Sequence, residues 1–570
     1  MKPNVSTKMD RRTMLRSAIG LGAMMTGVSP VHSLLAYTDQ HSSKTNILDP
    51  KKYGAKGDGI SADTRAVQQA IDDCSQSGGG TVSISSGQYV IGTIVLKSNV
   101  NLFLQPGSTL LANMNMNDYA MPEDARIASH NVLARHLVFA YRAENISITG
   151  TGVIDGQSHY HLSRNTRPDP AQDDLWKEVI AWNWRLGTYI SPMVELAECT
   201  NVLVENITLR NAAGWTLRPV GCDGVTIRGI KIRNPIYSPN ADGIDPACSQ
   251  NVLISDCDIF TGDDAICVKS FNPYGENKTS RNILVTNCTL STCCNGFKVG
   301  VEGPGGFENI TFRDSTIWSG EVPFNERVIS GIAIEMADNG WINGVTVSNI
   351  TMRNVRTPIF IRLQNSYRNK NAQMSGRLQN VNISGIQATG AILSSSITGL
   401  QGFPAENVVL KNIHISTQEQ GDIAWAKNAV PELPNSGPEA RMFGRLPAFG
   451  FYCRHAKGIQ FQDVQVRSET NDPRPLVASE DVSDFSATRF NAIGVSGVHE
   501  LVELKNVQNA IFQNCSVAES VGVYATISGS QCRDIIFRNN DLHLAKVPFQ
   551  VADDVPAKAV QIAVTHTASQ

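Results

Sequence analysis

The sequence has no excess of charge of either sign and no long run of like charges. Lysine and arginine total 49 against 52 for aspartate and glutamate, and the formal net charge of the 570 residues is -3. Such a chain lacks the basic field that holds a nucleic acid or an anionic membrane surface. Hydrophobic residues make up 41% of the chain, which excludes a mostly disordered protein. We expect a globular protein that binds neither nucleic acid nor, once mature, a membrane.

Cysteine pairs of the metal-binding kind and bilayer-spanning runs are missing as well. None of the twelve cysteines belongs to a C-x-x-C pair, and their irregular spacing argues against a zinc site. We interpret most of them as small buried hydrophobic residues. The weakly apolar stretch at residues 18–28 is too short and too rich in glycine to cross a bilayer.

The first 36 residues have the pattern of an export signal. Arg11 and Arg12 precede the apolar stretch, and small residues follow near Ser33 and Ala36. This order predicts a twin-arginine signal over residues 1–36 and a periplasmic or extracellular mature protein, residues 37–570. The alternative is a basic, frayed N-terminus with a chance pair of arginines.

From about residue 99 the chain repeats one phrase, an asparagine followed by alternating apolar residues, a break and a second short alternation. Several copies begin 23 to 31 residues apart, at Asn145, Asn201, Asn251, Asn282, Asn309, Asn380 and Asn407, with variants at Gly224, Gly344, Gly458, Asn509 and Asp534. Strands this short cannot bury an apolar face alone, whereas stacked coils can. A fixed Leu-x-x-Leu-x-Leu frame is missing, which argues against leucine-rich repeats.

The repeat therefore predicts an all-β protein, a single-domain parallel β-helix whose coils are about 4.8 Å apart. Asparagine tolerates the left-handed conformation of a tight turn, which explains its place at each coil start. One helix is expected, capped by Asp63 or Thr64, carrying apolar residues at helical spacing and ended by the glycines at 78–80. Within an N-terminal cap at about residues 48–98, this helix would cover the open end of the solenoid.

Acidic residues interrupt the repeat at two places that are 21 residues apart. Asp242 lies in NADGID at residues 240–245, and Asp263 and Asp264 lie in GDD at residues 262–264. Because this interval is close to one coil, the carboxyl groups should stack on one face, where mutual repulsion raises at least one pKa. Asp263 and Asp264 can share that face only if the chain bends there. An acid and a base across a sugar linkage hydrolyse glycosides; the alternative is a set of ordinary turn aspartates beside glycine.

Together with YGAKGDG at residues 53–59, GVIDG at 152–156 and GWTLRP at 214–219, these two acidic motifs make the sequence resemble the polygalacturonase family, glycoside hydrolase family 28. The resemblance implies a right-handed β-helix and inverting hydrolysis of a pectin-type polysaccharide, galacturonan or rhamnogalacturonan. It also implies that Asp263 is the general acid, that Asp242 and Asp264 hold and activate the attacking water, and that no metal or organic cofactor takes part. Asn240, beside Asp242, is a predicted substrate-binding residue. The expected partner is the glycan alone, acted on by a monomer.

Two departures from the family pattern concern substrate binding. Asn295 stands where the family carries the histidine of Gly-His-Gly, and Ala333 to Glu335 stand where it carries Arg-Ile-Lys. A carboxylate at the place of a cation repels a uronate. Lys298 can supply a cation from a neighbouring coil, so the subsite is predicted either to take a neutral sugar such as rhamnose or to read a uronate through Lys298. The alternative for Lys298 and Glu335 is a solvated surface pair.

An insertion at about residues 417–457 is rich in aromatic residues and proline. It either lines the substrate site with sugar-stacking rings or packs on the solenoid as a flap. Arg362 is a further candidate for substrate binding, on a segment that otherwise suits core packing.

Two rival functions remain open. A polysaccharide lyase on the same scaffold would use calcium and a basic residue, and a carboxylate cluster suits calcium too. A non-catalytic glycan-binding solenoid would explain the missing histidine, arginine and lysine.

Overall fold

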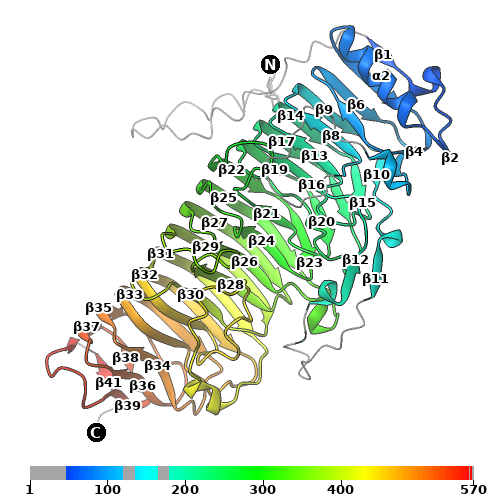
Figure 1. Ribbon diagram of the computed structural model, residues 1–570. Coiled ribbons are helices and arrows are strands. Elements are labelled where there is room, and N and C mark those ends of the chain that lie inside the picture. The colour runs from blue at the N-terminus through cyan, green and yellow to red at the C-terminus, as the bar shows by residue number, and fades with distance from the viewer. Residues whose placement is uncertain (1–45, 120–134, 165–176, 178, 564, 568–570) are drawn as a thin grey trace, which may run out of the picture. The chain divides into compact units, whose positions relative to one another are not determined.

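The chain winds into stacked coils with three columns of parallel strands (Figure 1). The computed structural model describes residues 46–119, 135–164, 177, 179–563 and 565–567. The predicted export signal, residues 1–36, lies outside the described residues. In the part of the chain that is described, no helix is long and apolar enough to cross a membrane.

The first column follows the asparagine of each repeat. Its members pair in order as β1 (Ile47–Leu48), β3 (Gly80–Ile84), β6 (Val100–Leu104), β9 (Glu144–Gly150), β14 (Thr200–Glu205), β17 (Asp223–Arg228), β19 (Gln250–Ser255), β22 (Ser280–Thr286) and later β35 (Gln508–Gln513), β37 (Arg533–Arg538) and β40 (Val560–Ala563).

The second column consists of the strands that follow the asparagine-containing segment. Its members are β2 (Asp58–Ala62), β4 (Gly87–Ile91), β7 (Ser108–Ala112), β10 (Val153–Asp155), β15 (Thr208–Arg210), β18 (Lys231–Arg233), β20 (Asp258–Thr261), β23 (Thr289–Thr292) and, near the end, β38 (Asp541–Leu542) and β41 (His566–Thr567).

The third column carries the residues that matter for function. Its members are β5 (Ile94–Leu96), β8 (Val138–Tyr141), β13 (Val194–Ala197), β16 (Leu217–Val220), β21 (Ile266–Val268), β24 (Asn295–Val299), β26 (Ser330–Met336), β28 (Thr357–Leu363), β30 (Ser395–Thr398), β34 (Glu500–Lys505), β36 (Val521–Ser528) and β39 (Ala545–Val551).

Six long strands pass around a corner from one column into the next, where the sequence predicts two short strands with a break. They are β25 (Phe307–Trp318), β27 (Trp341–Arg353), β29 (Arg377–Ala391), β31 (Ala405–Thr417), β32 (Phe451–Ser468) and β33 (Val477–Ile493). An antiparallel pair, β11 (Leu162–Arg164) and β12 (Trp184–Leu186), lies outside the columns, and short 3-10 helices include η5 (Ile180–Asn183) and η7 (Ile423–Lys427).

Inward-pointing side chains of the three columns form one apolar core. In the third column Ile266, Phe297, Ile332 and Ile359 stand in register and are fully buried. The twelve cysteines are buried and unbonded to one another, as the sequence predicts for most of them. The predicted right-handed parallel β-helix is confirmed.

Asparagine at the coil starts has a second role besides the predicted turn. Asn145, Asn201 and Asn251 adopt positive φ of 54°, 60° and 57°. Their side chains also form a ladder between coils, since the Asn145 amide donates to Asn99 Oδ1 (2.9 Å) and Asn201 donates to Asn145 Oδ1 (2.6 Å). The amide therefore links neighbouring coils as well as shaping each turn.

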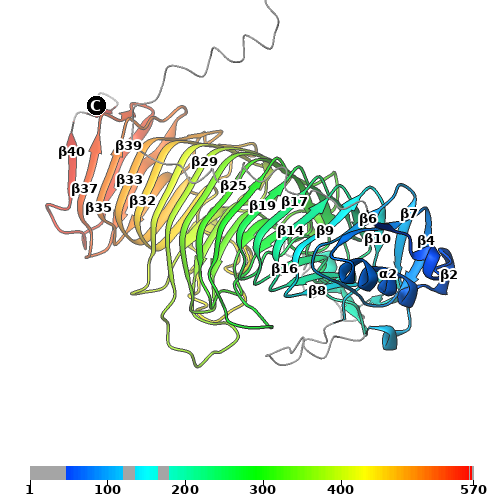
Figure 2. The ribbon, with the colours of Figure 1, turned by 90° about the horizontal axis from the view of Figure 1, so that it is seen from above.

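Helix α2 (Thr64–Gln76) lies across the N-terminal end of the coils (Figure 2), where the sequence predicts a cap. The Gln68 side chain bonds to the backbone of β5, accepting from Val95 N–H (2.7 Å) and donating to Val95 O (3.1 Å). It thereby satisfies groups that an edge strand would leave unpaired. The expected helix cap is wrong in detail: Asp63 is the N-cap residue, but its carboxylate accepts from the N–H groups of Lys56 and Gly57 instead.

Candidate active site

Asp242, Asp264 and Asn295 lie in one row at the start of the third column, on three consecutive coils. Ile244 pairs with Ile266, and Ile266 pairs with Phe297. The three polar residues each lie two positions before these partners, and the Gly243 N–H donates to the Asp264 carbonyl (2.9 Å). The structure thus brings the two acidic motifs together on one face, each side chain only 3% exposed.

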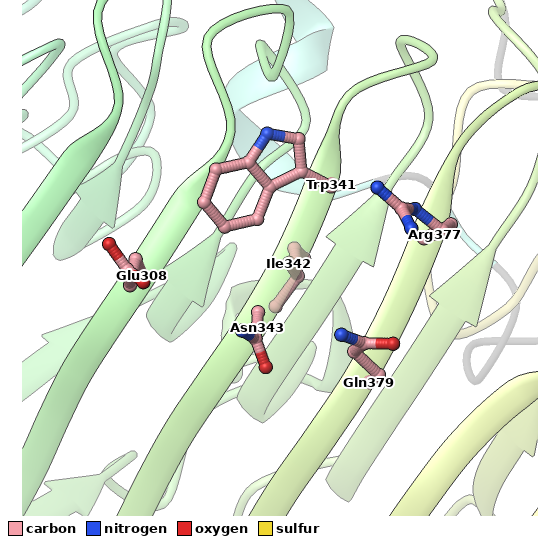
Figure 3. A pocket seen from close by; sticks show the side chains of 6 residues that line it. All are labelled: Glu308, Trp341, Ile342, Asn343, Arg377 and Gln379. Atoms are coloured by element: carbon pink, nitrogen blue, oxygen red, sulfur yellow. The ribbon is translucent and has the colours of Figure 1, made fainter.

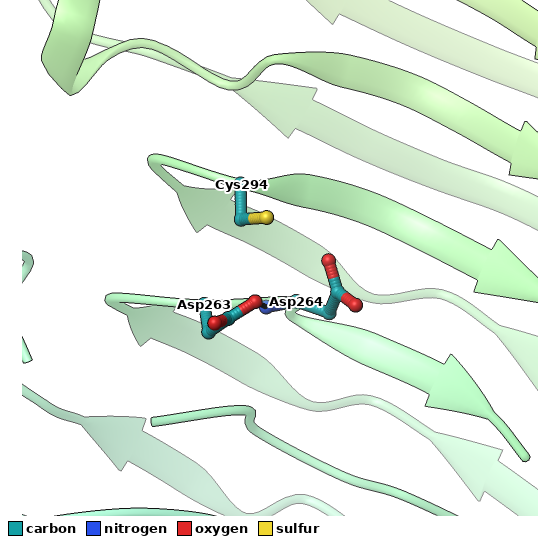
Figure 4. A group of neighbouring side chains, drawn as sticks. All are labelled: Asp263, Asp264 and Cys294. Atoms are coloured by element: carbon teal, nitrogen blue, oxygen red, sulfur yellow. Dashed lines mark hydrogen bonds between the residues drawn. The ribbon is translucent and has the colours of Figure 1, made fainter. Parts of the chain in front are cut away.

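Asp263 reaches the same face because the chain bends between β20 and β21, which end at Thr261 and begin at Ile266. Its carboxylate accepts from the Asp264 N–H (2.8 Å) and from the Asn240 N–H (3.2 Å). A Cβ at Gly262 would lie 2.4 Å from the Ser238 carbonyl oxygen, so this tight bend requires glycine. Figure 4 shows both aspartates on the bend, with Cys294 on the next coil.

Asp264 is held as a carboxylate. Lys298 Nζ lies 3.1 Å from its Oδ2, and the Asn295 amide donates to its Oδ1 (2.6 Å). Burial raises the pKa of Asp264, but Lys298, Lys269 and the Asn295 hydrogen bond outweigh burial and hold this pKa below its ordinary value. Asn295 therefore contacts an acidic side chain directly, and no described residue donates a hydrogen bond to its own Oδ1.

Asp263 differs from its neighbour in the direction in which its pKa is shifted. Burial and the adjacent Asp264 carboxylate raise the pKa of Asp263, against the opposing influence of Lys298. The side chain is nevertheless more exposed than Asp264. Two adjacent carboxyl groups whose pKa values are shifted in opposite directions suit an acid and a base.

A second charged cluster surrounds Asp242. Lys269 Nζ lies 3.3 Å from Asp242 Oδ2, 3.8 Å from Asp245 Oδ1 and 3.3 Å from Glu302 Oε2. Burial and repulsion from Asp245 raise the pKa of Asp242 well above its ordinary value, although Lys269 opposes this. The Oδ1 of Asp242 is buried and accepts no hydrogen bond among the described residues.

Glu335 and Lys298 form a buried pair and not the solvated pair that the sequence leaves as an alternative. Lys298 Nζ lies 3.5 Å from Glu335 Oε2, and the Glu335 side chain is fully buried while that of Lys298 is 12% exposed. Burial raises the pKa of Glu335 to about 7, and Lys298 opposes the rise. Lys298 thus bridges the carboxyl groups of Asp264 and Glu335.

Arg362, predicted as a substrate-binding residue, lies in this column but is buried beneath the insertion. It pairs in register with Glu335 and is fully buried. Its Nη1 donates to the Gly399 carbonyl (2.9 Å) and its Nη2 to the Glu432 carbonyl (2.7 Å). We therefore assign Arg362 to holding the insertion and not to substrate.

The insertion between β31 and β32, residues 418–450, packs on the solenoid. Phe443 and Leu446 of the insertion are buried in one apolar cluster with Tyr452 of β32, Phe360 of β28 and Cys294. The aromatic residues that could have stacked on sugar are thus mostly used in packing.

Asp263, Asp264 and Cys294 are the cation-ligating candidates in the part of the chain that is described. One ligand atom from each lies within 4.8 Å of the others. Burial raises the pKa of the Cys294 thiol well above its ordinary value, and Lys298 already neutralises Asp264. The donor set therefore fits a metal ion poorly.

Lys269 and the ring of Trp215 are site components that the sequence reasoning did not assign. Lys269 Nζ lies 5.0 Å and Arg218 Cζ 4.7 Å from the centroid of the Trp215 ring. Side chains alternate between the two faces of a strand, so Lys269 points outward like Cys267, two positions before it. This alternation is the sequence signal from which an outward Lys269 could have been predicted.

Comparison with known proteins gives a family match. The model of glycosyl hydrolases family 28 matches residues 74–432. A probable polygalacturonase of Vitis vinifera is 25% identical over 439 residues, 70% of this chain and 82% of its own length. An endo-polygalacturonase of Pectobacterium carotovorum is 28% identical over 338 residues, 56% of this chain and 77% of its own.

Solved structures are similar in fold. An exopolygalacturonase of Thermotoga maritima superposes with a TM-score of 0.54 at 23% identity, over 68% of this chain and 90% of that one. A family 28 exopolygalacturonase of Yersinia enterocolitica gives 0.53 at 19% identity, over 90% and 79%.

Proposed function

Since the chain belongs to glycoside hydrolase family 28 and is a hydrolase of O-glycosyl bonds, we propose that it cleaves a pectin-related glycan with Asp263 as general acid and Asp264 as general base. The observation that carries this proposal is the pair of adjacent carboxyl groups with oppositely shifted pKa values on one bend. Asp242, on the preceding coil, is proposed to hold the attacking water together with Asp264.

The reaction needs two proton transfers. Asp263 gives its proton to the glycosidic oxygen as the bond from that oxygen to the anomeric carbon breaks. Asp264 takes a proton from water while the water oxygen bonds to the anomeric carbon. Lys298 keeps Asp264 ionised until that step, and Asp242 on the preceding coil is proposed to orient the same water.

Inversion at the anomeric carbon is part of the proposal and needs its own test. Inverting enzymes usually hold the two carboxyl groups about 6.5–9.5 Å apart. Oxygens of Asp263 and Asp264 lie within 4.8 Å, so this pair alone does not meet the spacing expected for inversion. Proton NMR of the first product formed reports the anomer directly, and a retained anomer would refute inversion.

For the sugar beside the scissile bond, we propose either that a uronate is recognised through the cation of Lys298 or that the subsite takes a neutral sugar such as rhamnose. Glu335 is fully buried and paired to Lys298, so it lies too deep to repel a bound uronate directly. Comparing initial rates on homogalacturonan, rhamnogalacturonan and neutral oligosaccharides separates these substrates.

We further propose that the enzyme acts at chain ends. Past Lys298, the insertion crosses the outward face of the third column. Pro434 O accepts from the Asn365 N–H (3.0 Å), and the Asn435 amide donates to Ser366 O (2.9 Å). Phe360 and Arg362 are buried beneath it. The β28 strand is three coils from Asp264, about 14 Å at one strand spacing per coil, so a glycan has room for only a few sugars on this side.

The insertion is also closed on its other flank. Arg441 Nη1 donates to Lys177 O (2.6 Å), and Val179 and Ala181 share an apolar cluster with Phe443.

Short products from the first minutes, with little loss of viscosity, are expected on polygalacturonate. A ladder of intermediate sizes would refute the chain-end mode.

Asp263→Asn tests the chemistry itself. Removing a general acid is expected to lower kcat by about 10²–10⁴-fold with a small change in KM. Asp258→Asn, on the exposed end of the same strand region, serves as the matched control.

Unsaturated products absorbing in the ultraviolet, or a calcium requirement, would favour the lyase; no turnover in the parent would favour a binding protein. Export to the periplasm or exterior and a monomeric state complete the proposal.

A further inference from the structure

A hollow of about 210 Å³ lies on the outward face of the first column, away from the catalytic row. It spans β25, β27 and β29 (Figure 3). In register order, Glu308 pairs with Asn343 and Asn343 with Gln379, and Trp341 pairs with Arg377. Residues two apart on a strand point to the same side, so these five side chains share one face.

The Trp341 ring forms one wall of the hollow and rests on backbone. A Cβ built on Gly306 would lie 2.3 Å from Trp341 Cε2 and 2.4 Å from Nε1, and Gly306 has a φ of +82°. Glycine at this place therefore lets the indole lie flat on the preceding coil. Trp341 remains partly exposed, unlike the buried aromatic residues of the insertion.

The polar side chains around the ring are largely uncommitted. Among the described residues, no hydrogen bond or ion pair of the Glu308, Arg377 or Gln379 side chain is found. Asn343 uses only its Oδ1, which accepts from the Asn380 amide (2.7 Å). An aromatic ring beside free planar donors and acceptors is suited to a sugar, which offers an apolar ring face and a rim of hydroxyl groups.

We propose that this hollow is a second, non-catalytic glycan-binding site for a uronate-bearing chain. A sugar ring lies on Trp341, its carboxylate pairs with the Arg377 guanidinium, and Glu308 accepts from hydroxyls at the opposite end. Glu308 and Arg377 lie two strands and two residues apart, about 12 Å, so the opposite charges fix the direction of the chain. The hollow, at about 210 Å³, accommodates only a short part of a longer glycan.

The choice of a uronate rests on the proposed function, whereas sugar binding itself rests on Trp341 and its neighbours. The test uses the full mature chain carrying Asp263→Asn, so that ligand survives, run in native gels containing polygalacturonate or neutral galactan. Trp341→Ala and Arg377→Gln are compared with Trp318→Ala, which replaces a 39% exposed tryptophan elsewhere on the solenoid.

Trp341→Ala and Arg377→Gln should each weaken retention by polygalacturonate about tenfold, and Trp318→Ala should not. With Asp263 intact, Trp341→Ala should slow turnover of polymer but leave that of a trisaccharide unchanged. Retention unaffected by Trp341→Ala, or an equal loss on trisaccharide, would overturn the site. Equal loss on galactan with Arg377→Gln would overturn the uronate assignment. If the parent retains polygalacturonate through Trp341 but never cleaves it, the binding site stands and the proposed hydrolysis falls.

Discussion

Replacing Lys298 by methionine keeps the length of the side chain and removes one buried ammonium group. That group lies 3.1 Å from Asp264 and 3.5 Å from Glu335. The variant leaves Asp264 with the Asn295 amide as its strongest neighbour on this side, at 2.6 Å. We therefore expect Asp264 to bind a proton more readily.

The size of the effect follows from the distance. At 3.1 Å and an effective dielectric constant of 20, two unit charges attract by about 5 kcal/mol, an upper limit before reorganisation. A cation at such a distance typically lowers the pKa of an aspartate by about 1–3 units. The pKa of Asp264 should rise by that amount in the variant, and the acidic limb of kcat/KM against pH should move upward with it. Loss of the shared cation should also cost about 3–5 kcal/mol of the free energy of unfolding.

The assay is the pH dependence of kcat/KM on a short oligosaccharide, with folding checked by circular dichroism at each pH. Lys278→Met is the matched control, because Lys278 also pairs with a carboxylate, with its Nζ 3.7 Å from Glu198 Oε2, but its side chain is 54% exposed. If Lys298→Met folds poorly, adding Glu335→Gln removes the other carboxylate and should keep the upward move. An acidic limb that stays in place or moves downward would refute the assignment of Asp264 as the base held ionised by Lys298.

Three further outcomes concern stability, each measured by urea unfolding. Burial raises the pKa of Glu335 from 4.5 to about 7, so its contribution to the free energy of unfolding is present below about pH 4.5 and is lost as the pH rises to about 7. Across that window the stability of Glu335→Gln should increase relative to that of the parent protein by up to about 3 kcal/mol. A difference in stability that does not change with pH would contradict this. Gln68→Ala should lose about 1–3 kcal/mol with its two bonds to β5, whereas Gln69→Ala, on the exposed side, should lose little. Arg474→Met should lose about 3–5 kcal/mol because it strands buried carboxylates 2.6 Å away, while a loss no larger than that of the exposed Arg353→Met would argue against it.

Local sequence patterns were enough to predict most of the fold. Alternation, spacing and the asparagine turns predicted the parallel β-helix, and helical spacing followed by glycines predicted α2. The long strands such as β25 were not predicted, because β25 continues through the corner at Asp314, a left-handed residue, from its pairing with β22 to its pairing with β23. Hydrogen-bond pairing across that corner depends on both neighbouring coils, which a single repeat does not reveal.

The site was predictable where it depends on coil length. The interval between Asp242 and Asp263 and the need for a bend at residues 262–264 both follow from strand geometry. The burial of Arg362 was not predictable, because the groups that cover it belong to an insertion about 70 residues further along the chain. Lys269 was overlooked because its acidic partners lie on other coils.

The contact between Arg441 and Lys177 joins residues 264 positions apart. In an ordinary solenoid each repeat touches only its neighbours, so the array can fray from either end one repeat at a time. Here the contact between Arg441 and Lys177 links the two ends of a run of repeats, so none of these repeats can unfold separately before that contact breaks. This middle section should therefore unfold as a single cooperative unit, while repeats beyond β33 remain free to fray on their own.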